Sequence, residues 1–123
     1  MSCRLFFSSP SYYTSIEIFR MKDRNVPVET FEIREQVLDF CWEPNGARFG
    51  VVHSTQETRA SVSFYDLHGV TKAKGCDKLF TLTDRECNTL SWQPNGGIAV
   101  LLGAGSPHNG RLEFYSVDDD EVL

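Results

Sequence analysis

The sequence contains no long hydrophobic run. Its longest unbroken apolar stretch extends only from Ile98 to Leu102, whereas a membrane-spanning helix needs about 18 or more apolar residues. Near the amino terminus, the apolar stretch Leu5 to Phe7 is much shorter than the core of about 7–15 residues found in secretory signal peptides. The sequence therefore predicts neither a membrane span nor secretion.

An excess of basic residues is also missing. The chain has 12 Lys and Arg residues against 17 Asp and Glu residues, which gives a net charge of −5. Free-standing nucleic-acid-binding domains normally carry a basic surface, because contacts with phosphates supply much of their affinity. Nucleic acid is therefore disfavoured as the main ligand, and any RNA contact is expected to be local and supported by partners.

The cysteines and histidines lack the close spacings of metal ligands. Cys3, Cys41, Cys76 and Cys87 include no Cys-x-x-Cys pair, and the three histidines are equally scattered. Zinc ligands usually come in such closely spaced pairs. We therefore expect no metal site, no cofactor and no disulfide framework, and reduced thiols are typical of a cytosolic protein.

A folded domain is nevertheless expected from the composition. The chain of 123 residues is 41% hydrophobic and 12% aromatic, which suffices for a core in a single domain of about 100–200 residues. No segment has a sustained helical periodicity. Pro27 opposes a helix in its neighbourhood, because proline lacks the amide donor and restricts the preceding residue. The class predicted is all-β.

An internal repeat is the strongest signal in the sequence. Residues 37–67 align without a gap on residues 87–117, which lie fifty positions further along the chain. Each copy has a short strand rich in β-formers, then a Pro-Asn-Gly turn and a further apolar strand. The six identities pair Trp42, Pro44, Asn45, Gly46, Phe64 and Tyr65 with Trp92, Pro94, Asn95, Gly96, Phe114 and Tyr115.

Four short antiparallel strands repeated every 40–50 residues or so are typical of a β-propeller, while a β-sandwich is the alternative for regularly spaced strands. The pattern divides the chain into the end of a blade at 1–36, a complete blade at 37–86 and a partial blade at 87–123. A propeller needs about 4–8 blades to close, so about two and a half blades predict a piece of a larger propeller. The expected strands are 15–20, 28–33, 37–42, 49–52, 60–67, 77–83, 88–92, 98–102 and 111–117.

Eight residues of the repeat are predicted to form its structural core. The tryptophans are expected to fill the packing between blades, where loss of one would cost about 3–5 kcal/mol. The prolines and glycines are expected to set the turns. The set comprises Trp42, Pro44, Gly46, Phe64, Trp92, Pro94, Gly96 and Phe114.

The order of several short strings resembles the b subunit of eukaryotic translation initiation factor 3. The resemblance covers about Ser15 to Val117, and initiation factor 2A proteins carry a related propeller. It depends on the order of the strings more than on any single Trp-x-Pro-x-Gly, which is common among propellers. The strings are SIEIFRM at 15–21, DRNVPVE at 23–29, FCWEPNGARF at 40–49, VSFY at 62–65, NTLSWQPNG at 88–96 and NGRLEF at 109–114.

This resemblance implies a non-catalytic scaffold segment of an initiation factor complex that binds the small ribosomal subunit. Its implied partners are the other subunits of the complex, ribosomal proteins and ribosomal RNA, with no membrane and no small-molecule substrate. Two alternatives remain. One is a generic WD40-like interaction propeller, or an initiation factor 2A-like protein, in another assembly, and the other is an enzyme, which the absence of a convergent catalytic motif disfavours.

The densest basic stretch is the candidate for ribosome contact. Lys72, Lys74, Lys78 and Arg85 follow the third strand of the complete blade and run into its fourth. Contacts of such residues with RNA phosphates are non-specific and sensitive to salt. Exposed charges also serve solubility alone, and the sequence does not separate the two roles.

Overall fold

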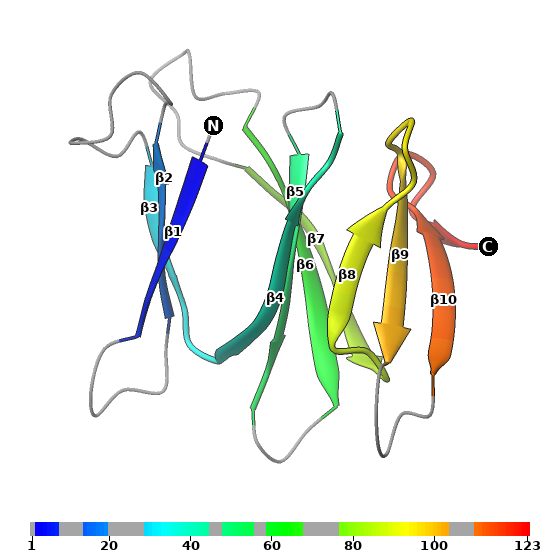
Figure 1. The fold of residues 1–123 in the computed structure, drawn as a ribbon, viewed down its shortest axis with the longest axis horizontal. Coiled ribbons are helices and arrows are strands. Elements are labelled where there is room, and N and C mark those ends of the chain that lie inside the picture. Colours follow the sequence, from blue (N-terminus) through cyan, green and yellow to red (C-terminus); the bar gives the residue numbers. More distant parts are fainter. Residues whose placement is uncertain are drawn as a thin grey trace.

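Three antiparallel sheets stand side by side along the chain (Figure 1). The computed structural model describes residues 2–7, 14–19, 29–44, 48–55, 59–67, 77–103 and 110–123. All regular structure in these ranges is β-strand. Within the same ranges there is no helix of the length and apolar character needed to cross a membrane.

The first sheet has three strands in the order β1-β2-β3, with bounds Ser2–Phe7, Thr14–Phe19 and Glu29–Ile33. Strands β2 and β3 lie where the sequence predicted them. Strand β1 was not predicted, although it pairs along its whole length with β2, from Ser2 opposite Phe19 to Phe7 opposite Thr14. It was missed because its short apolar stretch, Leu5 to Phe7, was considered only as a possible signal peptide.

The second and third sheets have four strands each, in the orders β4-β5-β6-β7 and β11-β10-β9-β8. The bounds in the second sheet are Gln36–Trp42, Arg48–Ser54, Ala60–Asp66 and Asp77–Arg85. Those in the third are Thr89–Trp92, Ile98–Gly103, Arg111–Ser116 and Glu121–Val122. Every strand expected in these regions is present, and the two-residue strand β11 is an addition that the sequence pattern did not indicate.

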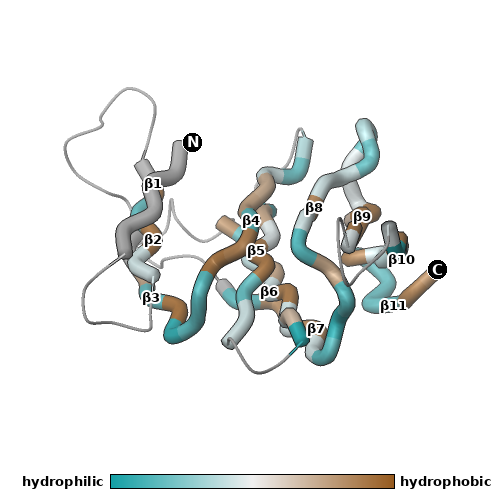
Figure 2. The backbone as a smooth tube through the Cα atoms, turned by 60° about the horizontal axis from the view of Figure 1, so that its bottom comes forward, coloured by the Kyte–Doolittle hydropathy of each residue, from teal (hydrophilic) through white to brown (hydrophobic). Residues whose placement is uncertain are grey.

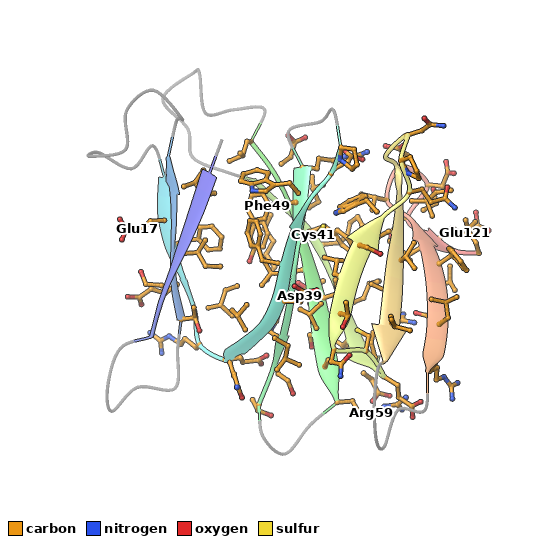
Figure 3. The ribbon with its side chains drawn as sticks, viewed as in Figure 1. Glu17, Asp39, Cys41, Phe49, Arg59 and Glu121 are labelled. Carbon is orange, nitrogen blue, oxygen red and sulfur yellow. The ribbon has the colours of Figure 1, made fainter. Side chains whose placement is uncertain are left out.

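Two hydrophobic cores fill the spaces between successive sheets. Side chains of a strand point alternately to its two faces, so neighbouring residues of β5 enter different cores. Phe49 and Val51 are fully buried against Ile16 and Ile18 of the first sheet, whereas Val52 faces the third sheet. Figure 3 shows Phe49 in the space between the first and second sheets.

Aromatic stacking dominates both cores. In the first, Phe49 stacks on Tyr65 with ring centroids 5.1 Å apart. In the second, Phe64 stacks on Tyr115 of the third sheet at 5.9 Å. Figure 2 shows the corresponding hydrophobic stretches along the strands of the second sheet. Each sheet therefore completes the core of the sheet before it.

Close approach of the second and third sheets depends on Gly50. A Cβ atom at this position would lie 2.5 Å from the Cδ2 atom of Leu90, and it would also crowd the ring of Phe64. Real Cβ atoms do not approach other carbon atoms so closely. A side chain at this position would therefore force Leu90 to shift, so glycine favours the packing of β8 against β5, although the sequence repeat gave no indication of it.

The eight predicted core residues occupy different environments. Phe64 is fully buried and Trp92 is 9% exposed, while Trp42, Pro44 and Gly96 are half-buried. Phe114 and Pro94 do not belong to the core, since both are exposed. Phe114 occupies the position in the third sheet that Phe64 occupies in the second, but no described strand covers that outer face. Gly46 lies outside the described residues.

Candidate functional site

The second and third sheets are joined at one end by the buried carboxylate of Glu43, whose side chain is 6% exposed. It accepts hydrogen bonds from Nε and Nη2 of Arg48, at 2.9 and 2.6 Å, and from the backbone N–H of Gly97 at 2.7 Å. Arg48 also donates to Asp118 at 2.7 Å. Because these atoms come from the turn after β4, from β5 and from the turns of the third sheet, the group ties the two sheets together.

Electrostatics keep this carboxylate charged. Burial alone would raise the pKa of Glu43, but the hydrogen bonds from Arg48 and Gly97 outweigh burial, so the pKa lies below its ordinary value. The hydrogen bond to Glu43 in turn raises the pKa of Arg48. The pair is therefore ionised across the physiological range.

Strands β4 and β8, the first strands of the second and third sheets, are joined by hydrogen bonds that involve side chains and not by β-sheet pairing. Asp39 accepts a hydrogen bond from the backbone N–H of Leu90 at 2.7 Å, and the indole N–H of Trp92 donates to the carbonyl of Cys41 at 3.2 Å. Figure 3 labels Asp39 and Cys41 on β4, beside β8. Together with Glu43, these contacts fix the third sheet against the second along the length of β4.

A groove with a volume of about 280 Å³ lies between the first and second sheets. We call it the inter-sheet groove, and its lining includes Glu32, Arg34, His53, Tyr65 and Lys78. These residues come from β3, the β3–β4 connection, β5, β6 and β7. The groove is therefore assembled only when the first two sheets are packed together.

A chain of hydrogen bonds runs along the floor of this groove. The Nδ1 atom of His53 lies 2.6 Å from a carboxylate oxygen of Glu35, and its Nε2 atom lies 2.7 Å from the hydroxyl of Ser63. That hydroxyl is 2.9 Å from the hydroxyl of Thr81. The chain ties β5, β6 and β7 to the connection that leaves the first sheet.

The order carboxylate, histidine and serine is that of a hydrolase triad. However, Ser63 is 0% exposed and its hydroxyl has a second partner in Thr81, so a substrate carbonyl has no access to it. The arrangement fits a structural role. Sequence reasoning considered His53 only as a metal ligand or as the partner of a cysteine nucleophile. A better signal would have been that His53 and Ser63 are polar residues among the apolar positions of two adjacent strands.

A cluster of opposite charges lies at the other end of the second and third sheets, where Figure 3 labels Arg59. Glu86 accepts from Arg59 at 2.9 Å and lies 3.1 Å from Arg111, Asp84 lies 3.3 Å from Arg59, and Arg85 pairs with Glu113 at 2.8 Å. Three arginines are thus balanced by three carboxylates, and two of the pairs join the second sheet to the third. The cluster serves as a second tie between these sheets and leaves no excess of positive charge.

The predicted ribosome-contact residues do not form one surface in the described part of the chain. Lys78 is exposed at the start of β7, whereas Arg85 ends the same strand and pairs with Glu113. They are seven positions apart on the strand, which corresponds to about 23 Å. Lys72 and Lys74 lie outside the described residues.

The described cysteines have the character of buried hydrophobic residues. Cys41 and Cys87 are free thiols. Burial, helped by Glu113, raises the pKa of Cys87 to about 11, and burial, helped by Asp39, also raises the pKa of Cys41. Thiols with raised pKa values are poor nucleophiles and poor metal ligands. Among the described residues, no three His, Cys, Asp or Glu side chains are grouped so as to hold a metal ion.

Comparison with known proteins bears on both fold and function. Residues 4–123 match the family described as "Eukaryotic translation initiation factor eIF2A". The chain is also similar to proteins named as the B subunit of eukaryotic translation initiation factor 3. The identity is 38% with that of Arabidopsis thaliana (92% of this chain, 16% of that protein), 39% with that of Xenopus laevis (89% and 15%) and 38% with that of Dictyostelium discoideum (88% and 15%).

The chain spans about a sixth of the length of these relatives. A solved structure titled "Crystal structure of the eukaryotic initiation factor" superposes with a TM-score of 0.61 at 13% identity, over 99% of this chain and 30% of that chain. This likeness, together with the three antiparallel sheets, confirms the all-β fold of a partial β-propeller. The similarity to the b subunit of initiation factor 3 expected from the short strings is confirmed as well.

Proposed function

Because the chain belongs to the family of eukaryotic translation initiation factor eIF2A, we propose that it is a non-catalytic scaffold segment of a translation initiation factor complex. The complex would bind the small ribosomal subunit and support assembly of the preinitiation complex in the cytoplasm. The partners of the segment would be other subunits of the complex and components of the small ribosomal subunit.

The observation that carries this proposal is the packing of three successive sheets against one another. Both spaces between the sheets are filled by buried hydrophobic side chains, and the second junction is reinforced by the buried pair of Glu43 and Arg48. Sheets packed in this way hold their exposed turns and edges in a defined arrangement, which a scaffold requires. The buried position of Ser63 speaks against hydrolysis at the triad-like arrangement.

Ribosome contact through basic residues remains part of the proposal. Lys72 and Lys74 are its main candidates, because Arg85 is neutralised by Glu113 and Lys78 faces the inter-sheet groove. Charge reversal at both lysines is expected to weaken association with the small ribosomal subunit, and the difference from the unmodified chain should be largest at low salt and shrink as salt is raised. Lys72→Arg with Lys74→Arg keeps the charge and is the matched control.

The test is sedimentation of the tagged full chain in a cell lysate, followed by mass spectrometry of the fractions. Co-migration with the small ribosomal subunit and other initiation factor subunits, lost at high salt, is the expected result. Migration with an unrelated set of proteins would reject this function and support a generic interaction propeller. If co-migration is unchanged by charge reversal of Lys72 and Lys74, the scaffold role stands and the contact at these residues is rejected.

A further inference from the structure

The distribution of unpaired positive charge singles out the inter-sheet groove. The structure describes six lysine and arginine side chains. Four of them form ion pairs with carboxylates, namely Arg48, Arg59, Arg85 and Arg111. Arg34 and Lys78 have no ion pair with any described residue, both are exposed, and both line this groove.

The two cations stand at opposite ends of the groove. Lys78 lies opposite Tyr65 in the pairing of β6 with β7. At the other end, Arg34 precedes Glu35, whose carboxylate holds His53, and His53 lies opposite Ser61. Tyr65 and Ser61 are four residues apart on β6, which corresponds to about 13 Å along the strand. An extended segment of a few residues would span this distance.

The floor between the two cations is largely buried. Ile33 and Tyr65 are each 7% exposed, and in the hydrogen-bonded pair His53 is 9% exposed and Ser63 0%. A ligand for this site is therefore held mainly through negative charges that reach Arg34 and Lys78. We propose that the inter-sheet groove binds an extended acidic peptide segment of a partner protein.

A peptide suits the groove better than RNA does. Proteins that bind nucleic acid through its backbone commonly neutralise about 6–10 phosphates, and single-stranded bases stack on exposed aromatic rings. Only two cations of the groove are free of ion pairs with described residues, and its aromatic ring, Tyr65, is buried. A guanidinium such as that of Arg34 matches a carboxylate through two parallel hydrogen bonds.

Glu32 provides an internal test of the charge argument. It is an exposed carboxylate in the lining of the same groove, so it repels an acidic ligand while Arg34 and Lys78 attract one. Removing its charge is therefore expected to tighten binding, whereas removing either cation is expected to weaken it. A purely steric or apolar site would not respond in these opposite directions.

The experiment measures binding of a fluorescently labelled oligoglutamate peptide to the purified full chain by anisotropy at low salt. Oligoglutamine and oligouridine of matching length are the comparison ligands. We expect oligoglutamate to bind in preference to both. Arg34→Gln with Lys78→Gln should weaken binding about tenfold, and Glu32→Gln should tighten it about threefold. Arg111→Gln removes an exposed arginine outside the groove and should change binding less than twofold or so.

Three results would overturn the proposal. The first is that the unmodified chain does not bind oligoglutamate. The second is that the double variant at Arg34 and Lys78 binds oligoglutamate as tightly as the unmodified chain does. The third is that the unmodified chain binds oligouridine and the double variant does not. The last would make the groove an RNA site. Equal urea midpoints for all four proteins establish that the exposed substitutions leave the fold intact. Peptide binding is measured without ribosomes or other subunits, so its outcome does not depend on whether the chain joins an initiation factor complex.

Discussion

Replacing Glu43 by glutamine tests whether its carboxylate holds the second and third sheets together. Glutamine has nearly the same shape, so the packing around residue 43 is kept while the negative charge is removed. The carboxylate accepts three hydrogen bonds, two from Arg48 and one from Gly97. After the substitution, one amide oxygen remains as acceptor, and the amide NH2 group faces the guanidinium.

The expected loss of stability follows from these contacts. A hydrogen bond to a charged group contributes about 1.5–3 kcal/mol against about 0.5–1.5 kcal/mol for a neutral one. Removing one partner of a buried ion pair costs about 3–5 kcal/mol when the other charge is left uncompensated. Arg48 keeps Asp118 as a partner, although the side chain of Asp118 is 65% exposed. We therefore expect Glu43→Gln to lower the free energy of unfolding by about 2–3 kcal/mol.

Urea denaturation of the full chain at neutral pH, followed by tryptophan fluorescence, measures this change, because Trp92 lies at the affected junction. Asp118→Asn is the matched control, since it removes a carboxylate from the same arginine at an exposed position. It should cost at most about 1 kcal/mol. Equal losses for the two variants, or a loss below about 1 kcal/mol for Glu43→Gln, would refute the assignment of Glu43 as the central residue of the junction.

The pH dependence gives a second test of the same residue. The pKa of Glu43 is lower in the folded chain than its ordinary value. Its contribution is therefore fully present above the pKa of the unfolded chain, about 4.3, and is lost as pH falls through the lowered folded pKa. The stability difference between the unmodified chain and Glu43→Gln should be constant near neutral pH and shrink in acid. A difference that grows in acid would contradict this sign.

Three further predictions concern single residues. Phe64→Ala should destabilise the chain by about 3–5 kcal/mol in urea denaturation, because Phe64 is fully buried. Phe114→Ala, at the equivalent but 36% exposed position, should cost less than half as much. Equal costs would show that the outer face of the third sheet is covered. Cys87 should react with a disulfide reagent at pH 8 only as fast as the chain unfolds, because it is only 2% exposed in the folded chain. Its burial also raises its pKa to about 11. Reaction at the rate of a free thiol would contradict its burial. Gly96→Ala should lower the melting temperature for two reasons. Gly96 has a φ of 77°, which strains a residue with a side chain, and a Cβ atom there would lie 3.1 Å from the side chain of Glu43. An unchanged melting temperature would contradict both reasons.

The strands of the second and third sheets were predictable because their signals are local. The alternation of β-formers and the Pro-Asn-Gly turns both lie within a few residues, and the repeat allowed each copy to support the other. Strand β1 has an apolar stretch of only three residues, Leu5 to Phe7, and β11 is only two residues long. Strands β2 and β3 lie outside the repeat, but their β-forming residues were enough to predict them.

The sites were less predictable because they depend on which residues the register places together. Lys78 and Arg85 are close in sequence, but the extended backbone of β7 holds them apart. Arg34 and Lys78 are distant in sequence, but the packing of the first two sheets places both in one groove. Burial of a residue in the repeat also depends on whether another sheet packs on it. Phe64 is buried because the third sheet covers it, whereas Phe114 is exposed.

The stacking of Tyr115 on Phe64 has a consequence for synthesis of the protein. Protein chains emerge from the ribosome amino terminus first, and folding units form as they emerge. The second sheet ends its last strand at Arg85, yet the face that carries Phe64 is covered only by residues of the third sheet up to Tyr115 and Val117. The nascent chain therefore exposes an aromatic face until some thirty further residues have left the exit tunnel, and during that interval a chaperone or a wrong partner can compete for it.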